Sequence, residues 1–158
     1  MKLVAKSLAV VSALFLLAAC ESGTTGSGGA GGSGSPATPG TQEDLTQNVG
    51  DRVFFDTDSS TLSAEAQDTL SKQVEWLKQY SNVNVTVEGH CDERGTREYN
   101  IALGERRAAV TKRYLLDKGI AAGRISTISY GKERPAVVGS DESAWSQNRR
   151  SVSVVSNQ

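Results

Sequence analysis

Residues 83–115 read VNVTVEGHCDERGTREYNIALGERRAAVTKRYL, and they decide the fold because a strand, a charged loop and a helix follow one another there. Valines alternate with polar residues over 83–88, which predicts a half-buried strand that ends before Gly89. A polar loop with both charge signs follows, and a helix is predicted from about Glu98. Loops held between regular elements commonly carry binding residues, so we expect a binding site in this loop.

The flanking sequence adds strands and helices in alternation. Turn-forming residues follow the first predicted strand, and Ser63 is a suitable N-cap for an amphipathic helix after it. The order β-α-β-α-β-(α)-β predicts an α+β fold, with the two main helices packed on one face of a sheet. The predicted elements outside 83–115 are a strand at 52–55, the helix with the apolar stripe Ala66, Leu70, Val74 and Leu77, a strand at 125–130, a short helix at 141–147 and a strand at 150–155.

The first twenty residues have the layout of a lipoprotein signal. Lys2 and Lys6 precede an apolar run at 8–19, which is too short for a membrane-spanning helix of about 20 apolar residues. The end of the run, Leu17-Ala18-Ala19-Cys20, resembles a bacterial lipobox, which implies cleavage before Cys20 and acylation of that cysteine. The residue after the cysteine is Glu21. An aspartate at that position often retains a lipoprotein in the inner membrane of Gram-negative bacteria, so a glutamate favours the outer membrane.

A tether is predicted to separate the lipid from the folded part. Residues 22–41 are almost entirely glycine, serine, threonine, alanine and proline, which bury too little apolar surface to fold. We therefore expect a cleaved signal peptide at 1–19, lipidated Cys20 with a flexible tether at 20–44, and one domain at 45–158. The tether would confine the domain near the membrane and raise its effective concentration for anything close by.

The charge balance argues against nucleic acid as a partner. The 158 residues include 17 basic and 18 acidic side chains, and cleavage before Cys20 leaves 15 and 18, a net charge of −3. A nucleic-acid-binding domain favours a strongly basic face. Of the two cysteines, Cys20 is expected to carry lipid, so Cys91 has no partner and no disulfide is expected.

The predicted second helix places an arginine beside a packed face. Asn100, Leu103 and Arg107 share one face, and Gly104 beside them would let the helix approach the sheet closely. A guanidinium at such a border needs a carboxylate partner or an anionic ligand. An internal ion pair between Arg107 and an acidic loop residue such as Asp92 is the interpretation that the residues alone favour. An anion-binding pocket is the alternative.

A metal site or a thiol enzyme is not expected, although His90, Cys91 and Asp92 are adjacent in the loop. Neighbours in an extended segment alternate in direction, so these three side chains cannot readily face one ion. His90 is the single histidine, and a Cys–His nucleophile also needs a third group to orient it. We therefore expect no catalysis, no metal and no cofactor.

Longer motifs resemble the peptidoglycan-associated lipoprotein (Pal) group of the OmpA-like domain family. The resemblance covers the chain from about Val53 to Val155 and implies an OmpA-like β-α-β-α-β-β sandwich with a mixed sheet. The motifs lie at Phe55-Asp56, 87–90, 92–96, 98–103, 106–108, 129–137 and 148–150.

The resemblance also implies a function and its residues. It implies non-covalent binding of peptidoglycan through the diaminopimelate of its stem peptide, whose zwitterionic end Asp92 and Arg107 would grip from both sides. A carboxylate and a guanidinium at fixed separation match the two charges of a free amino-acid end. The other family positions that contact ligand correspond to Arg94, Leu103, Phe55 and Asp56, while Asn100 is expected to support the loop first and to contact ligand second.

The partners implied are peptidoglycan, outer-membrane lipid through Cys20, and the periplasmic protein TolB, in states that exclude one another. The cell outer membrane, with the domain in the periplasm, is the implied location, and a role with the Tol system in envelope integrity and cell division follows. A generic OmpA-like wall anchor without a Tol link is the alternative. Departures from the family pattern are Arg97 in place of a proline, Gly104 and Thr111 in place of a serine and a valine, and Cys91 at a variable position.

Overall fold

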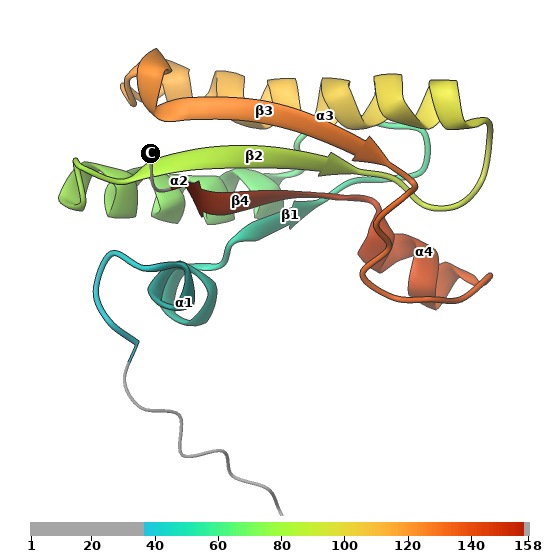
Figure 1. The fold of residues 1–158 in the computed structure, drawn as a ribbon, viewed down its shortest axis with the longest axis horizontal. Helices are drawn as coiled ribbons and strands as arrows, with labels where there is room; N and C mark the ends of the chain where they lie inside the picture. Colours follow the sequence, from blue (N-terminus) through green and yellow to red (C-terminus); the bar gives the residue numbers. More distant parts are fainter. Residues whose placement is uncertain (1–36, 157–158) are drawn as a thin grey trace, which may run out of the picture. The chain divides into compact units, whose positions relative to one another are not determined.

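The computed structural model describes residues 37–156, which form a four-stranded sheet with helices (Figure 1). The expected signal peptide, Cys20 and most of the tether lie outside the described residues. The elements are α1 (Gln42–Asp44), the π-helical turn η1 (Leu45–Val49), β1 (Arg52–Phe54), α2 (Ala64–Gln79), β2 (Asn84–His90), α3 (Arg97–Asp117), the 3₁₀ turn η2 (Ala122–Arg124), β3 (Ile125–Gly131), α4 (Glu142–Asn148) and β4 (Arg150–Ser156).

The sheet is mixed, with the strand order β1-β4-β2-β3. Strand β4 runs antiparallel to both β1 and β2, whereas β2 and β3 are parallel, so the chain must cross over between them. Helix α3 makes that crossover. The predicted α+β fold with a mixed sheet is confirmed, and the predicted ends of its strands and helices differ from the observed ones by one or two residues.

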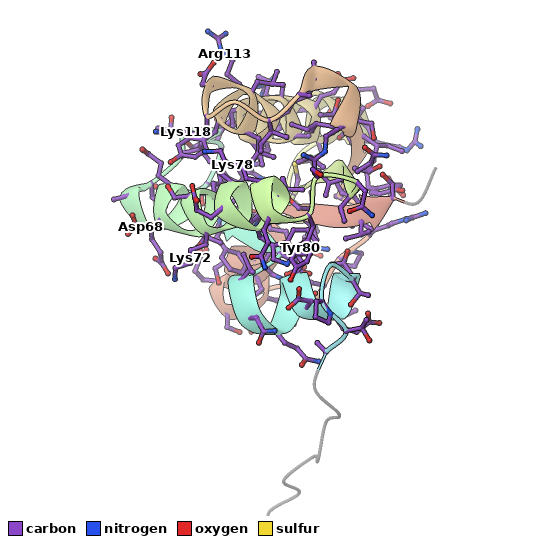
Figure 2. All side chains as sticks on the ribbon, turned by 90° about the vertical axis from the view of Figure 1, so that its left-hand side faces the viewer. Asp68, Lys72, Lys78, Tyr80, Arg113 and Lys118 are labelled. Carbon is purple, nitrogen blue, oxygen red and sulfur yellow. The ribbon has the colours of Figure 1, made fainter. Side chains whose placement is uncertain are left out.

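Both main helices pack on the same face of the sheet. Ser151 and Ser153 lie two residues apart on β4 and therefore point to the same side. The Ser151 hydroxyl lies 2.8 Å from that of Thr111 on α3, and the Ser153 hydroxyl donates to Gln73 of α2 at 2.8 Å. Figure 2 shows charged side chains such as Lys78 of α2 and Arg113 of α3 on the outer surface of these helices.

The core lies between this face and the helices. Ser63 caps α2 by accepting a hydrogen bond from the backbone N–H of Ala66 at 3.1 Å, as predicted. The predicted stripe of α2 is fully buried, and valines of β2 meet it from the sheet. The buried apolar residues that form the centre of the core are Ala66, Leu70, Val74, Leu77, Val85, Val87, Ala108, Leu115 and Ile125.

The folded unit includes residues before the expected domain start at 45. The Trp76 indole N–H donates to the Asp44 carboxylate at 2.8 Å, and Leu45 is buried. The side chain of Gln42 accepts the backbone N–H of Val155 at 2.7 Å and so covers the edge of β4 beyond the short β1. Figure 2 shows Tyr80, at the end of α2, beside this segment. These contacts are all tertiary, which explains why three polar residues next to the tether gave no local signal.

Glycines let α3 contact the sheet through its backbone. A Cβ added at Gly89 would overlap the carbonyl group of Gly104, and one added at Gly104 would overlap the Ser129 hydroxyl. The helix thus lies directly on the ends of β2 and β3, which accounts for a glycine inside α3 despite its cost to helix stability, about 1 kcal/mol. This close approach fixes the N-terminal half of α3 beside the charged loop.

Candidate binding site

A pocket of about 350 Å³ opens where the chain leaves β1 and β2 and enters α3. These ends of the two strands and of the helix lie on the right-hand side of Figure 1. The pocket brings together five of the residues that the sequence nominated, from the loop after β2 and from α3. The pocket is lined by Thr57, Asp58, Cys91, Asp92, Arg94, Gly95, Tyr99, Asn100, Leu103 and Arg107.

Arg107 is completely buried at the base of this pocket. Its guanidinium donates to three backbone carbonyls, those of Ser59 at 2.8 Å, His90 at 2.9 Å and Asp56 at 3.0 Å. It also lies over the ring of Phe55, 5.2 Å from the ring centroid. Burial lowers the pKa of Arg107, and the carbonyl dipoles compensate for part of the lost hydration. Three of its five N–H groups are thus used to join the β1–α2 loop to β2.

Asp92 pairs with two other arginines. One carboxylate oxygen accepts the backbone N–H and the Nε–H of Arg94, both at 3.1 Å, and the other accepts Arg94 Nη2 at 2.6 Å and Arg149 Nη1 at 3.5 Å. Burial by itself raises the pKa of Asp92, but the hydrogen bonds from Arg94, with the contribution of Arg149, outweigh it and hold the pKa below its usual value.

The internal ion pair between Arg107 and the loop, which the residues alone favoured, is wrong: neither Asp92 nor Glu93 pairs with Arg107. Arg107 is satisfied by carbonyl groups from two other segments, and the neighbouring Arg94 reaches Asp92 from the same loop. No periodic pattern in the sequence predicts either the carbonyl groups that Arg107 binds or the pairing of Arg94 with Asp92.

Arg149 contacts the predicted site residue Asp92, and the sequence analysis did not name it except as part of a family motif. It is 6% exposed and joins three segments. Its Nε donates to the Phe55 carbonyl at 3.0 Å, while its two terminal nitrogens reach Asp92 and Glu142. The adjacent Arg150 has no contact with Asp92 and donates to the carbonyls of Asn148 and Arg134 instead. The sequence alone could not tell which of the two neighbouring arginines serves the site.

The loop at 91–96 is held from several sides. Asn100 donates to the carbonyls of Arg94 at 2.7 Å and Thr96 at 3.0 Å, so its contacts in this structure support the loop. The Lys132 ammonium donates to the Gly95 carbonyl at 2.7 Å. The Arg94 guanidinium lies over the ring of Trp145 on α4, and its central carbon is 4.2 Å from the ring centroid. A cation stacked on an aromatic face is favoured by the ring quadrupole, so α4 steadies Arg94.

His90 and Cys91 do not form a reactive pair. The His90 ring is buried beside Glu88, 3.3 Å away, and Tyr130, whereas the Cys91 thiol donates to the Asn100 carbonyl at 3.3 Å. Burial raises the pKa of the Cys91 thiol, which disfavours the nucleophilic thiolate. Within residues 37–156 no group of three or more His, Cys, Asp or Glu is arranged to hold a metal ion.

The remaining predicted residues fall around the same pocket. Leu103 lines it, and Phe55 is buried beneath Arg107. Asp56 contributes its carbonyl to Arg107 and lines a second, adjacent pocket. Of the departures from the family pattern, Gly104 and Thr111 make the packing contacts described above, and Arg97 forms an exposed ion pair with Glu133 at 3.2 Å. None of the helices in the described part of the chain is long and apolar enough to cross a membrane.

This fold, with a charged pocket at the start of α3, is that of a known family. The OmpA family matches residues 54–149, and the chain belongs to it. A domain from Helicobacter pylori MotB shares the fold at 18% identity, with a TM-score of 0.63 over 68% of this chain and 85% of the other.

Within the family, the chain is similar to proteins named peptidoglycan-associated lipoprotein. The relative from Rhizobium meliloti is 60% identical over 116 residues, which are 73% of this chain and 66% of the relative. The relative from Haemophilus influenzae is 44% identical over 93% of this chain and 95% of its own length. The crystal structure of the peptidoglycan-associated lipoprotein from Burkholderia pseudomallei has a TM-score of 0.65 and 38% identity, over 67% of this chain and 90% of that one. On these similarities the protein is not an enzyme.

Proposed function

We propose that this protein is an outer-membrane lipoprotein that binds peptidoglycan non-covalently through the diaminopimelate of the stem peptide. One observation carries the proposal: the pocket places the carboxylate of Asp92 and the buried guanidinium of Arg107 in one small space. A free amino-acid end offers one ammonium and one carboxylate, so this pocket complements it in both signs. The names of the relatives agree with a wall ligand.

The charges around the pocket are balanced, which supports a zwitterion over a simple anion or cation. Its lining includes two carboxylates, Asp58 and Asp92, and two guanidiniums, Arg94 and Arg107. Asp58 accepts the hydroxyl of Tyr99, and Asp92 is paired with Arg94 and Arg149, so a ligand ammonium would take the place of a protein partner. A buried charge needs a partner of opposite sign, so a ligand with only one charge would leave one side of the pocket uncompensated.

Arg94 would exchange partners when the ligand binds. In this structure it covers Asp92, yet its side chain is 39% exposed and can turn toward a ligand. A zwitterion breaks one ion pair and makes two, because its ammonium takes Asp92 while its carboxylate takes Arg94 or Arg107. A ligand with only an ammonium breaks one pair and makes one, so it gains nothing. This difference would make the site select the amino-acid end of diaminopimelate.

The amino-terminal segment explains what peptidoglycan binding by this domain would achieve. A lipid on Cys20 would hold the chain in the outer membrane, and the tether would let the domain reach the wall, so that binding fastens membrane to wall. In the same proposal, TolB competes for the domain and releases it from the wall during cell division. A wall anchor without a Tol partner is the second candidate, and direct binding of purified TolB to the domain separates the two.

The test is calorimetric titration of the domain with a stem peptide that contains diaminopimelate, against one that carries lysine instead. We expect binding of the first and a large loss for the second, which lacks the terminal carboxylate. Asp92→Asn should weaken binding of the diaminopimelate peptide while the domain stays folded, because it removes the partner of the ligand ammonium, and Arg113→Ala, an exposed change on the outer surface of α3, is the control. Equal binding of both peptides to the parent would refute the two-sign clamp.

A further inference from the structure

A second pocket of about 460 Å³ lies beside the first and has a different chemistry. It is bounded by the end of β1, the start of α2 and the end of α4. Asp56 lines the second pocket, and the next two residues, Thr57 and Asp58, line the first. The two pockets are therefore neighbours, because consecutive Cα atoms are only about 3.8 Å apart.

The lining of the second pocket is rich in hydrogen-bond acceptors. Among residues 37–156, the carboxylates of Asp56 and Glu65 have no hydrogen-bond or ion-pair partner. The one cation of the lining, Arg149, is already paired with Asp92 and Glu142. Anionic ligands are thus disfavoured here, and a ligand that donates hydroxyl or amide hydrogens is favoured. Thr61 and Gln147 add a hydroxyl and an amide to the lining.

The pocket also has an exposed aromatic side. Phe54 lies on the edge strand β1 and is 46% exposed, although a phenylalanine is a residue type that usually lies inside. A ring beside several polar acceptors offers an apolar face and directed hydrogen bonds at once. Pyranose sugars have both matching features, with a face of C–H groups and a rim of hydroxyls.

We propose that the second pocket binds an N-acetylated sugar of the same wall ligand, next to the stem peptide held in the first. This inference rests on the proposed function, since it assigns the glycan part of that ligand. Two residues of the stem peptide separate diaminopimelate from the sugar, and an extended chain spans at most about 3.6 Å per residue, so these two residues reach about 7 Å and the side chain of diaminopimelate adds to that reach. That reach agrees with pockets that share a wall of three consecutive residues.

The experiment compares two ligands on one protein by calorimetry: the stem peptide alone, and the same peptide joined to its disaccharide. The disaccharide-peptide should bind about tenfold more tightly, which corresponds to one or two ordinary hydrogen bonds. Phe54→Ala and Gln147→Ala should each remove most of this gain and leave the affinity for the peptide alone unchanged. Ile128→Ala, an exposed apolar residue on the far edge strand β3, is the matched control and should keep the gain.

The outcomes separate this proposal from the function on which it rests. Equal affinities of the parent for the two ligands, or a gain that both variants retain, would overturn the sugar subsite while peptide binding stands. A gain obtained by lengthening the peptide in place of adding sugar would assign the pocket to peptide and also overturn it. Absence of binding by both ligands would reject the proposed function, and the subsite with it.

Discussion

Acidification should destabilise the domain through His90, the single histidine of the chain. Its side chain is 2% exposed, and burial, followed by the charge of Arg150 on β4, lowers its pKa from 6.5 to about 4. Arg134, after β3, acts in both directions, because its backbone raises the pKa of His90 more than its charge lowers it, and the charge of Arg52, on β1, lowers the pKa. A carboxylate oxygen of Glu88, 3.3 Å from Nε2, acts against them.

The magnitude follows from the difference between the folded and unfolded pKa values. A shift of about 2.5 units at about 1.36 kcal/mol per unit gives roughly 3 kcal/mol. The unfolded chain binds the proton first as the pH falls, so this stability is present above pH 6.5 and is lost as the pH drops toward 4. At pH 5 the expected loss is about 2 kcal/mol. An ion pair between the protonated His90 ring and Glu88 would reduce this loss of stability, so both free energies are upper limits.

The assay is urea denaturation followed by circular dichroism at pH 7 and pH 5. The parent should lose stability between the two, whereas His90→Gln, whatever its stability at pH 7, should lose much less. Because most carboxylates titrate below pH 5, the difference between parent and variant isolates the histidine. A parent and a variant with the same change would refute the argument. Since the His90 carbonyl also holds Arg107, ligand binding should weaken over the same pH range.

Three further changes test the packing around the site. Gly104→Ala should lower the free energy of unfolding by about 1–3 kcal/mol, because the new methyl group overlaps the Ser129 hydroxyl. Gly123→Ala is the control and should be nearly neutral, because a methyl group there meets open space. Equal effects of the two changes would contradict the close contact between helix and sheet. Arg149→Lys should raise the pKa of Asp92 in an NMR titration and weaken wall retention in sedimentation with isolated peptidoglycan, and an unchanged pKa would show that Arg149 does not act on this carboxyl group. Trp76→Phe removes a hydrogen bond to a carboxylate, worth about 1.5–3 kcal/mol, so hydrogen exchange in Gln42–Asp44 should accelerate while ligand affinity stays the same. Unchanged exchange there would mean that the indole N–H does not hold this segment.

Local patterns in the sequence were enough to predict most of the regular structure. Alternating valines predicted β2, the stripe of α2 predicted its buried face, and Ser63 predicted where that helix begins. These predictions succeeded because each depends on residues within a few positions of one another. The segment at Gln42–Asp44 failed this condition, since its contacts reach Trp76 and Val155.

The sequence by itself determined which residues carry charge near the start of α3, and the family motif they form. Only the tertiary structure decided how those charges pair. Arg107 hydrogen-bonds to carbonyls 17 to 51 positions away, and Asp92 meets Arg149 from 57 positions away. A buried guanidinium takes whichever acceptors the fold places around it, and no local pattern encodes that set. The physical result is a pocket in which Arg107 is anchored to backbone carbonyls and Asp92 is held by Arg94 and Arg149.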